Sequence, residues 1–149
     1  METIAIKKSI SINAKAERVW EVLFQDKYTR IWYEEFSKGS YAETDWQQGS
    51  KAVFKDNTQN GIVAKIAVNK PYQQLSIEYT GVIKDGVENY TNDEAQKVKG
   101  SHEVYYLANL DDHTLLSVEC DMPEEYFETM AAAWDKALEK IKDLAESKK

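Results

Sequence analysis

Few side chains of this sequence have the types and spacing that catalysis or metal binding requires. The two histidines, His102 and His113, lie well apart in the sequence, with no matching Asp or Glu spacing for a metal site or a catalytic pair. The one cysteine, Cys120, lies on the same face of a predicted strand as Leu116 and Val118, a pattern typical of a small buried side chain rather than a nucleophile. The sequence therefore predicts no metal site, no cofactor and no catalytic residue, and it leaves enzymatic activity undecided.

Lys8 is the charged side chain whose position is hardest to explain. It has the same parity as Ile4, Ile6, Ile10 and Ile12 in a strand-like segment. If Lys8 points inward, it needs a carboxylate partner or a ligand anion, because an isolated buried ammonium is costly. The simpler expectation is that a β-bulge or the strand end turns Lys8 towards solvent.

Aromatic side chains are the most numerous candidates for binding. They could fill the core, or some of them could line an apolar cavity in which tyrosine hydroxyls orient a ligand. The cavity-lining candidates are Trp32, Phe54, Ile66, Tyr79, His102, Tyr106, Val118, Tyr126, Met130, Trp134 and Ala137.

Charge and composition limit the class of protein. The chain has 149 residues, which suits one domain over 1–149, and its net charge of −7 disfavours nucleic acid and anionic membranes as partners. No apolar run approaches the ~20 residues that span a bilayer. The N-terminus alternates like a strand where a signal peptide would need an apolar segment, so we expect a cytoplasmic protein.

The elements that must position these residues follow from the periodicity. An alternating strand over 4–12 precedes two short helices, over 13–24 with Asn13 as N-cap and over 27–36. Period-two patterns then predict six strands, with 85–99 as a long loop or hairpin tip. The strands cover 40–46, 51–55, 62–68, 75–83, 104–110 and 116–120.

The last segment predicts one long amphipathic helix from Pro123 to Lys149. Proline suits a first helical turn, and acidic residues there oppose the helix dipole, as the basic residues Lys148 and Lys149 do at the far end. The apolar stripe is spaced by three and four residues. It comprises Tyr126, Met130, Trp134, Ala137, Leu138 and Ile141.

The ordered set of motifs resembles the START/Bet v 1-like (SRPBCC) helix-grip superfamily, and within it the branch of the activator of Hsp90 ATPase (AHSA1-like). The matching pieces are an apolar strand leading into V-W-x-x-L at 19–23, Trp32, a G-x-x-F-like strand start at 49–54, P-x-x-x-L at 71–75 and W-x-x-x-L at 134–138. The family's usual Ala-Pro before the first helix is replaced by Ala14-Lys15.

This resemblance implies an α+β helix-grip fold. A curved antiparallel sheet of about six or seven strands would wrap around the long C-terminal helix, with two short helices between the first two strands. It also implies a small apolar or amphipathic ligand between that helix and the sheet. A chaperone-binding module and a cyclase- or hydrolase-type enzyme using the same cavity remain alternatives, and we expect a monomer or weak dimer.

Overall fold

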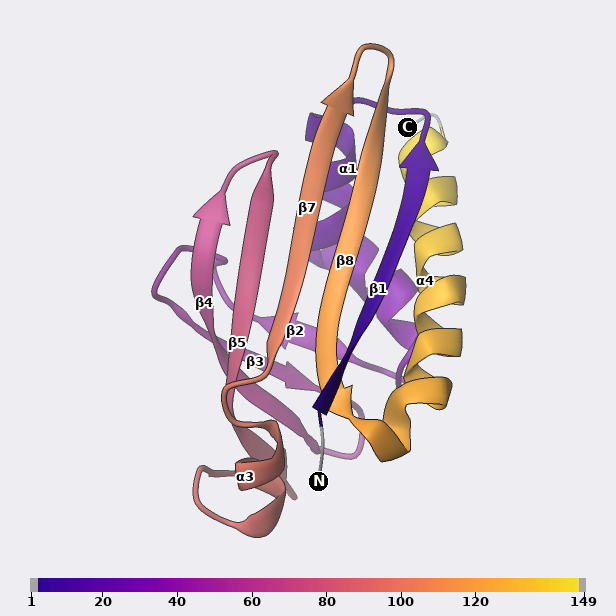
Figure 1. Cartoon of the computed structure of the whole chain (residues 1–149). Coiled ribbons are helices and arrows are strands. Elements are labelled where there is room, and N and C mark those ends of the chain that lie inside the picture. The colour runs from indigo at the N-terminus through magenta and orange to yellow at the C-terminus, as the bar shows by residue number, and fades with distance from the viewer. Residues whose placement is uncertain (1–2, 148–149) are drawn as a thin grey trace.

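An antiparallel sheet of eight strands bends around the C-terminal helix (Figure 1). The computed structural model describes residues 3–147. The strands are β1 (Thr3–Ile12), β2 (Tyr41–Glu43), β3 (Lys51–Lys55), β4 (Gly61–Lys70), β5 (Gln74–Lys84), β6 (Val87–Asn89), β7 (His102–Leu110) and β8 (His113–Pro123). The helices are α1 (Ala16–Phe24), α2 (Asp26–Trp32), α3 (Asp93–Val98) and α4 (Phe127–Glu146), with 3-10 turns η1 (Tyr33–Glu35) and η2 (Glu124–Tyr126).

The strand order β1-β8-β7-β5-β4-β3-β2 brings the first strand beside the last one, and β6 pairs with β5 off this path. The β1–β8 pairing is regular from Thr3 opposite Pro123 to Ile12 opposite Thr114. The β4–β5 pairing instead contains two irregularities, between Val63 and Ala64 and between Ile66 and Val68. Such bulges bend a sheet and increase its twist, which is how the sheet comes to wrap around a helix.

The predicted helix-grip fold is confirmed, with eight strands rather than six or seven. The additional elements lie in 85–99, which the sequence suggested as a loop or a hairpin tip: Asp85 and Gly86, both with positive φ, turn β5 into the short β6. Asn92 then caps α3, since its side chain accepts from the Ala95 amide at 2.8 Å. Too few apolar residues in this segment show a period for either element to be predicted.

The two short helices, α1 and α2, precede β2 as predicted, but the predicted N-cap is wrong. Lys15 occupies that position and makes no side-chain cap, whereas the Asn13 amide donates to the Glu146 carboxylate at 2.7 Å. This contact joins the chain before α1 to the C-terminal end of α4. Figure 1 shows α1 behind β7 and β8, at the same end of the sheet as the C-terminal end of α4.

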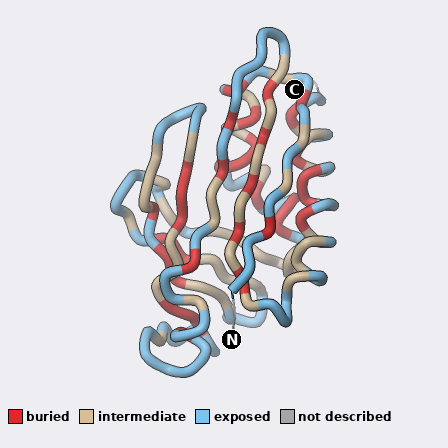
Figure 2. The backbone as a smooth tube through the Cα atoms, in the orientation of Figure 1, coloured by how far each residue is buried: buried red, intermediate tan, exposed pale blue. Residues whose placement is uncertain are grey.

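The predicted apolar stripe of the last helix faces the sheet from Met130 onwards, whereas Tyr126 lies in η2 and is exposed. Trp134, Ala137, Leu138 and Ile141 are buried in the main core, and Figure 2 shows the buried residues of α4 on its sheet side. The helix begins at Phe127 rather than Pro123, because β8 continues to Pro123 and the turn η2 follows. The last two predicted helical residues, 148 and 149, lie outside the described residues.

Lys8 lies on the inner side of β1, opposite Val118, and the pairing of β1 with β8 contains no bulge that would turn it to solvent. Its Nζ lies 2.8 Å from Asp135 Oδ1 on α4, with the Lys8 side chain 28% exposed. Of the two readings offered by the sequence, the inward lysine with a carboxylate partner is therefore the observed one.

None of the helices within residues 3–147 has the length and apolar character to cross a bilayer.

Candidate ligand-binding cavity

A cavity of about 600 Å3 lies between the N-terminal half of α4 and the sheet. This volume is within the range of small-molecule binding sites. Its walls come from α2, η1, α3, η2, α4 and strands β3, β4, β5, β7 and β8. The lining residues are Trp32, Tyr33, Phe36, Ser40, Phe54, Ile62, Tyr79, Val82, Glu94, Lys97, Val98, Ser101, Glu103, Cys120, Asp121, Met122, Pro123, Tyr126, Met130 and Trp134.

A row of aromatic rings forms one wall of the cavity. The ring centroids of Trp32 and Tyr33 are 4.6 Å apart, those of Phe36 and Trp134 4.9 Å, and those of Tyr33 and Phe54 6.4 Å. The Trp32 indole is fixed because its Nε1–H donates to the Val22 carbonyl at 3.0 Å. The wall is thus held in place by edge-to-face and tilted ring contacts that favour one arrangement.

A polar cluster stands against this apolar surface, centred on the carboxylate of Glu103. Tyr79 donates its hydroxyl hydrogen to Glu103 Oε1 at 2.6 Å, and Tyr105 donates to Oε2. Cys120 lies directly opposite Glu103 in the β7–β8 pairing and also lines the cavity. Within residues 3–147 no lysine, arginine or histidine lies within 4.0 Å of this carboxylate.

Burial changes the acidity of every member of the cluster. It raises the pKa of Glu103, and the two tyrosine hydrogen bonds offset part of that effect. Burial and the adjacent Glu103 raise the pKa values of Tyr79 and Tyr105 well above the ordinary range. Burial likewise raises the pKa of the Cys120 thiol. The thiol is therefore un-ionised and is not set up as a nucleophile.

Trp134 links the aromatic wall to the polar cluster. Its indole Nε1–H is buried and has no hydrogen-bond acceptor among the described residues. The indole lies close enough to Cys120 to lower the pKa of that thiol slightly, against the larger effect of burial. Sulfur is a weak acceptor, so this neighbour does not replace a proper hydrogen bond.

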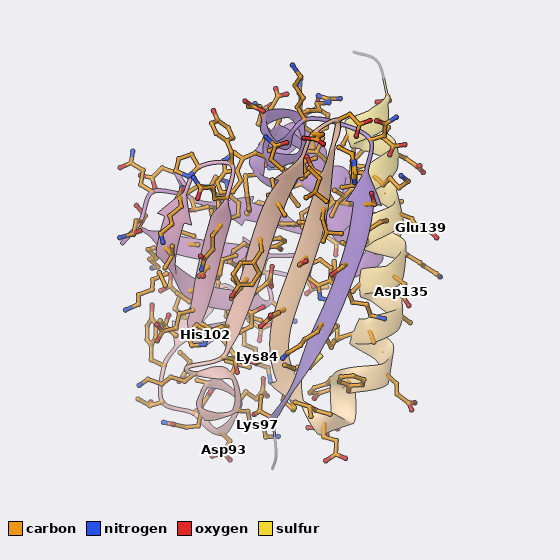
Figure 3. All side chains as sticks on the ribbon, turned by 45° about the horizontal axis from the view of Figure 1, so that its top comes forward. Lys84, Asp93, Lys97, His102, Asp135 and Glu139 are labelled. Atoms are coloured by element: carbon orange, nitrogen blue, oxygen red, sulfur yellow. The ribbon has the colours of Figure 1, made fainter. Side chains whose placement is uncertain are left out.

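Apart from Glu103, the charged side chains of the cavity stand at its rim. Glu94 and Lys97 project from α3 and are exposed, and Asp121 near the end of β8 completes this side. Figure 3 shows Lys97 on α3, at the end of the sheet remote from the C-terminal part of α4. A polar hollow of about 500 Å3 adjoins the cavity here and shares Lys97, Ser101, Asp121 and Pro123 with it.

The structure brings six of the eleven predicted cavity residues onto the cavity wall. These six are Trp32, Phe54, Tyr79, Tyr126, Met130 and Trp134. Whether they contact a ligand stays a prediction.

The other five do not line it. Ile66, Val118 and Ala137 are at most 1% exposed and belong to the packed core. These three side chains face the interior as predicted, but neighbouring side chains fill the space around them.

His102 and Tyr106 are on the wrong face of β7. Antiparallel partners share a face, and Tyr105 is opposite the buried Val118, so Tyr105 points inward and Tyr106 points out. The exposed His102 donates its backbone amide to Asp121 at 3.0 Å and is labelled in Figure 3. The sequence misled because the outer face of β7 carries more apolar side chains than the inner face, which contains Glu103 and Asn109.

This error of parity also concealed Glu103 and Tyr105, the two central polar residues. The signal that could have revealed them is the pairing of β7 with β8. The inward set of β8, Leu116, Val118 and Cys120, was clear from the sequence, and its register partners on β7 share its face. Tyr33 and Phe36 were expected on a helix but were not predicted to line the cavity, which they do.

A curved antiparallel sheet closed around one long helix, with a cavity between them, defines the helix-grip class of α+β proteins. The sequence matches the family described as activator of Hsp90 ATPase homolog 1-like protein over residues 13–146. The chain belongs to this family. Comparison with curated proteins finds no match.

Solved structures show the same fold at low identity. ChR145 from Cytophaga hutchinsonii superposes with a TM-score of 0.71 at 19% identity, covering 98% of this chain and 97% of its own. The Aha1 dimer from Colwellia psychrerythraea gives 0.70 at 15% identity, with 96% of each chain covered. DynU16, from the dynemicin biosynthetic locus, gives 0.71 at 13% identity over 96% of this chain, which spans 47% of DynU16. At these identities the likeness concerns the fold alone.

Proposed function

We propose that this protein binds a small apolar or amphipathic molecule in the cavity between α4 and the curved sheet. The observation that carries the proposal is the cavity itself, about 600 Å3 with a largely aromatic wall. The cavity opens to solvent at the exposed Glu94, Lys97 and Tyr126, so a ligand can enter, and the hydrophobic effect favours covering the apolar surface with an apolar ligand. Tyr126 and Met130, partly exposed near the start of α4, would contact the ligand at its entrance.

Binding of the neutral fluorescent probe N-phenyl-1-naphthylamine tests this proposal. We expect saturable binding and a raised melting temperature, since a ligand that binds the native state stabilises it. Met130→Trp narrows the cavity and should weaken binding severalfold, whereas Met130→Leu conserves volume and should bind like the wild type. Native mass spectrometry of the purified protein should also show a co-purified small molecule. Absence of both a co-purified species and probe binding would reject the proposal.

Chaperone binding is a second candidate because the matched family is named after an activator of the Hsp90 ATPase. It requires an external contact surface rather than a cavity. A pull-down of purified Hsp90 with wild-type protein and with Met130→Trp separates the two functions. Capture that is equal for both proteins, with no small-molecule binding by either, would favour the chaperone function.

The Glu103 cluster favours a third candidate, an enzyme that uses the cavity for acid–base chemistry. A carboxyl of raised pKa next to a bound substrate is a suitable proton donor or acceptor. Incubation with 2-acetylnaphthalene in D2O tests this possibility. Deuterium incorporation into its methyl group, faster than in buffer and lost in Glu103→Gln, would support catalysis. An exchange rate equal to that of buffer would count against it.

A further inference from the structure

The carboxylate of Glu103 has no positive partner although it faces an apolar cavity. Both of its oxygens accept from tyrosine hydroxyls, but no cationic side chain within residues 3–147 lies within 4.0 Å. Glu103 is half-buried at the cavity wall, so a ligand that fills the cavity would remove the remaining water from its carboxylate, and this is costly unless a cation compensates the charge. The cavity therefore contains a negative group whose counter-charge the described protein does not supply.

The aromatic rings around the cavity also attract a cation, as the Glu103 carboxylate does. Trp32, Tyr33, Phe36, Phe54 and Trp134 present ring surface to the cavity. The face of an aromatic ring is electron-rich and attracts a cation within about 6 Å of its centroid. The rings and the carboxylate thus favour the same kind of ligand group.

The two tyrosines beside Glu103 offer no hydrogen-bond donor to a ligand, and the neutral Trp134 indole is a donor at the cavity wall without an acceptor among the described residues. Tyr79 and Tyr105 each direct their hydroxyl hydrogen to Glu103, so neither is available to a ligand carbonyl or carboxylate. The lysine of the cavity, Lys97, is exposed on α3 at the rim. A ligand anion would have to approach Glu103 without a positive side chain beside it.

We propose that the cavity binds an organic cation, an ammonium or similar group on an apolar frame, with its positive end between Glu103 and the aromatic wall. The proposal rests on the function proposed above and specifies the ligand class. The rest of the frame lies against Met130, Val82 and Ile62, which are apolar. The net charge of −7 adds a general attraction for cations as they approach.

Three probes of similar shape distinguish charge from size. They are (2-naphthylmethyl)trimethylammonium, its neutral carbon isostere 2-neopentylnaphthalene, and the anion 2-naphthylacetate. Isothermal titration calorimetry at neutral pH should show that the ammonium binds roughly tenfold more tightly than the isostere, and the anion most weakly. Glu103→Gln should reduce the ratio between ammonium and isostere to near one. Glu119→Gln removes the same charge from a neighbouring position of β8 that does not line the cavity, and it should leave the ratio unchanged.

The outcomes separate this inference from the proposed function. Equal binding of ammonium and isostere, or a preference that survives in Glu103→Gln, would overturn the inference and leave apolar binding intact. Failure of all three probes to bind would reject both. If Glu103→Gln does not fold, NMR of the wild-type complex decides. Ring currents should shift the N-methyl protons upfield, and unshifted N-methyl protons would place the cation away from the aromatic wall and overturn the inference.

Discussion

The two halves of the interface between α4 and the sheet differ in how they are filled. Around the C-terminal half of the helix, Ala137, Leu138 and Ile141 are at most 3% exposed and pack in the main core. Around the N-terminal half, Met130 and Trp134 face a cavity of about 600 Å3. The same helix and the same strand β8 contribute to both halves, so neither element alone decides which half is open.

The difference arises from α1, which packs against the C-terminal half of α4. Arg18 of α1 donates to the carbonyl of Leu144 at 2.9 Å and to that of Ala145 at 3.3 Å. These bonds satisfy carbonyls that are unpaired at a helix end. At the other end, α3 lines the cavity with the partly exposed Val98 and the charged Glu94 and Lys97. These side chains border the cavity but do not fill it. One scaffold can thus combine a rigid packed half with a half available to a ligand.

Truncation should reveal the largest contrast between the halves. Ile141→Ala removes three heavy atoms from the filled half and should cost about 3 kcal/mol of unfolding free energy. Met130→Ala removes three heavy atoms beside a space that already exists, and it should cost about 1 kcal/mol or less. Urea denaturation measures both. Equal losses would show that the cavity half is packed as tightly as the other.

Enlargement tests the same contrast in the opposite direction. Ala137 is fully buried, so Ala137→Leu overpacks the filled half and should cost about 2 kcal/mol. Met130→Phe extends into the cavity and should change stability by about 0.5 kcal/mol or less. Thermal and urea denaturation of the two variants, with wild type as reference, provide the measurement. Similar tolerance of both substitutions would contradict a close-packed C-terminal half.

The Glu103 carboxyl gives the open half of the interface a stability that depends on pH. Because burial raises the pKa of Glu103 above 4.5, the folded state holds its proton more tightly than the unfolded state. Stability relative to Glu103→Gln is then highest below pH 4.5 and falls as the pH rises through the raised pKa. The groups facing it, Tyr33, Tyr79, Tyr105 and Cys120, have raised pKa values and stay neutral throughout.

Urea denaturation of wild type and Glu103→Gln between pH 4 and pH 8 measures this difference. We expect an effect smaller than the packing losses above. A difference that is constant with pH, or that grows in favour of the wild type as the pH rises, would show that the Glu103 carboxyl is not destabilised by burial.

The smallest effect should come from the ion pair that joins β1 to α4. Asp135 is 63% exposed, so solvent screens its attraction to Lys8. A double-mutant cycle with Lys8→Ala and Asp135→Ala should give a coupling energy of about 0.5 kcal/mol or less. Figure 3 shows Asp135 on α4 beside the edge of the sheet. A coupling above about 2 kcal/mol would mean that this contact, rather than packing, holds the helix on the sheet.

Much of the fold could be predicted from the sequence because its signals are local. The alternation of Ile6, Ile10 and Ile12 identifies β1, and the spacing of Trp134, Leu138 and Ile141 identifies the buried side of α4. Six of the predicted cavity residues line the cavity for the same reason. β6 and α3 lack such periodicity, since both are short and mostly exposed.

The sequence alone determined which residues alternate, which helix has an apolar stripe and which family the order of motifs resembles. The tertiary structure decided which face of β7 points inward, because the more apolar face of this strand is the outer one and only pairing with β8 identifies the inner face. That pairing places Glu103 and Tyr105 on the inner face of the sheet. Where the sheet bends and where α1 packs then decide which half of the interface is filled. These features depend on contacts between residues far apart in the chain, so no local pattern specifies them.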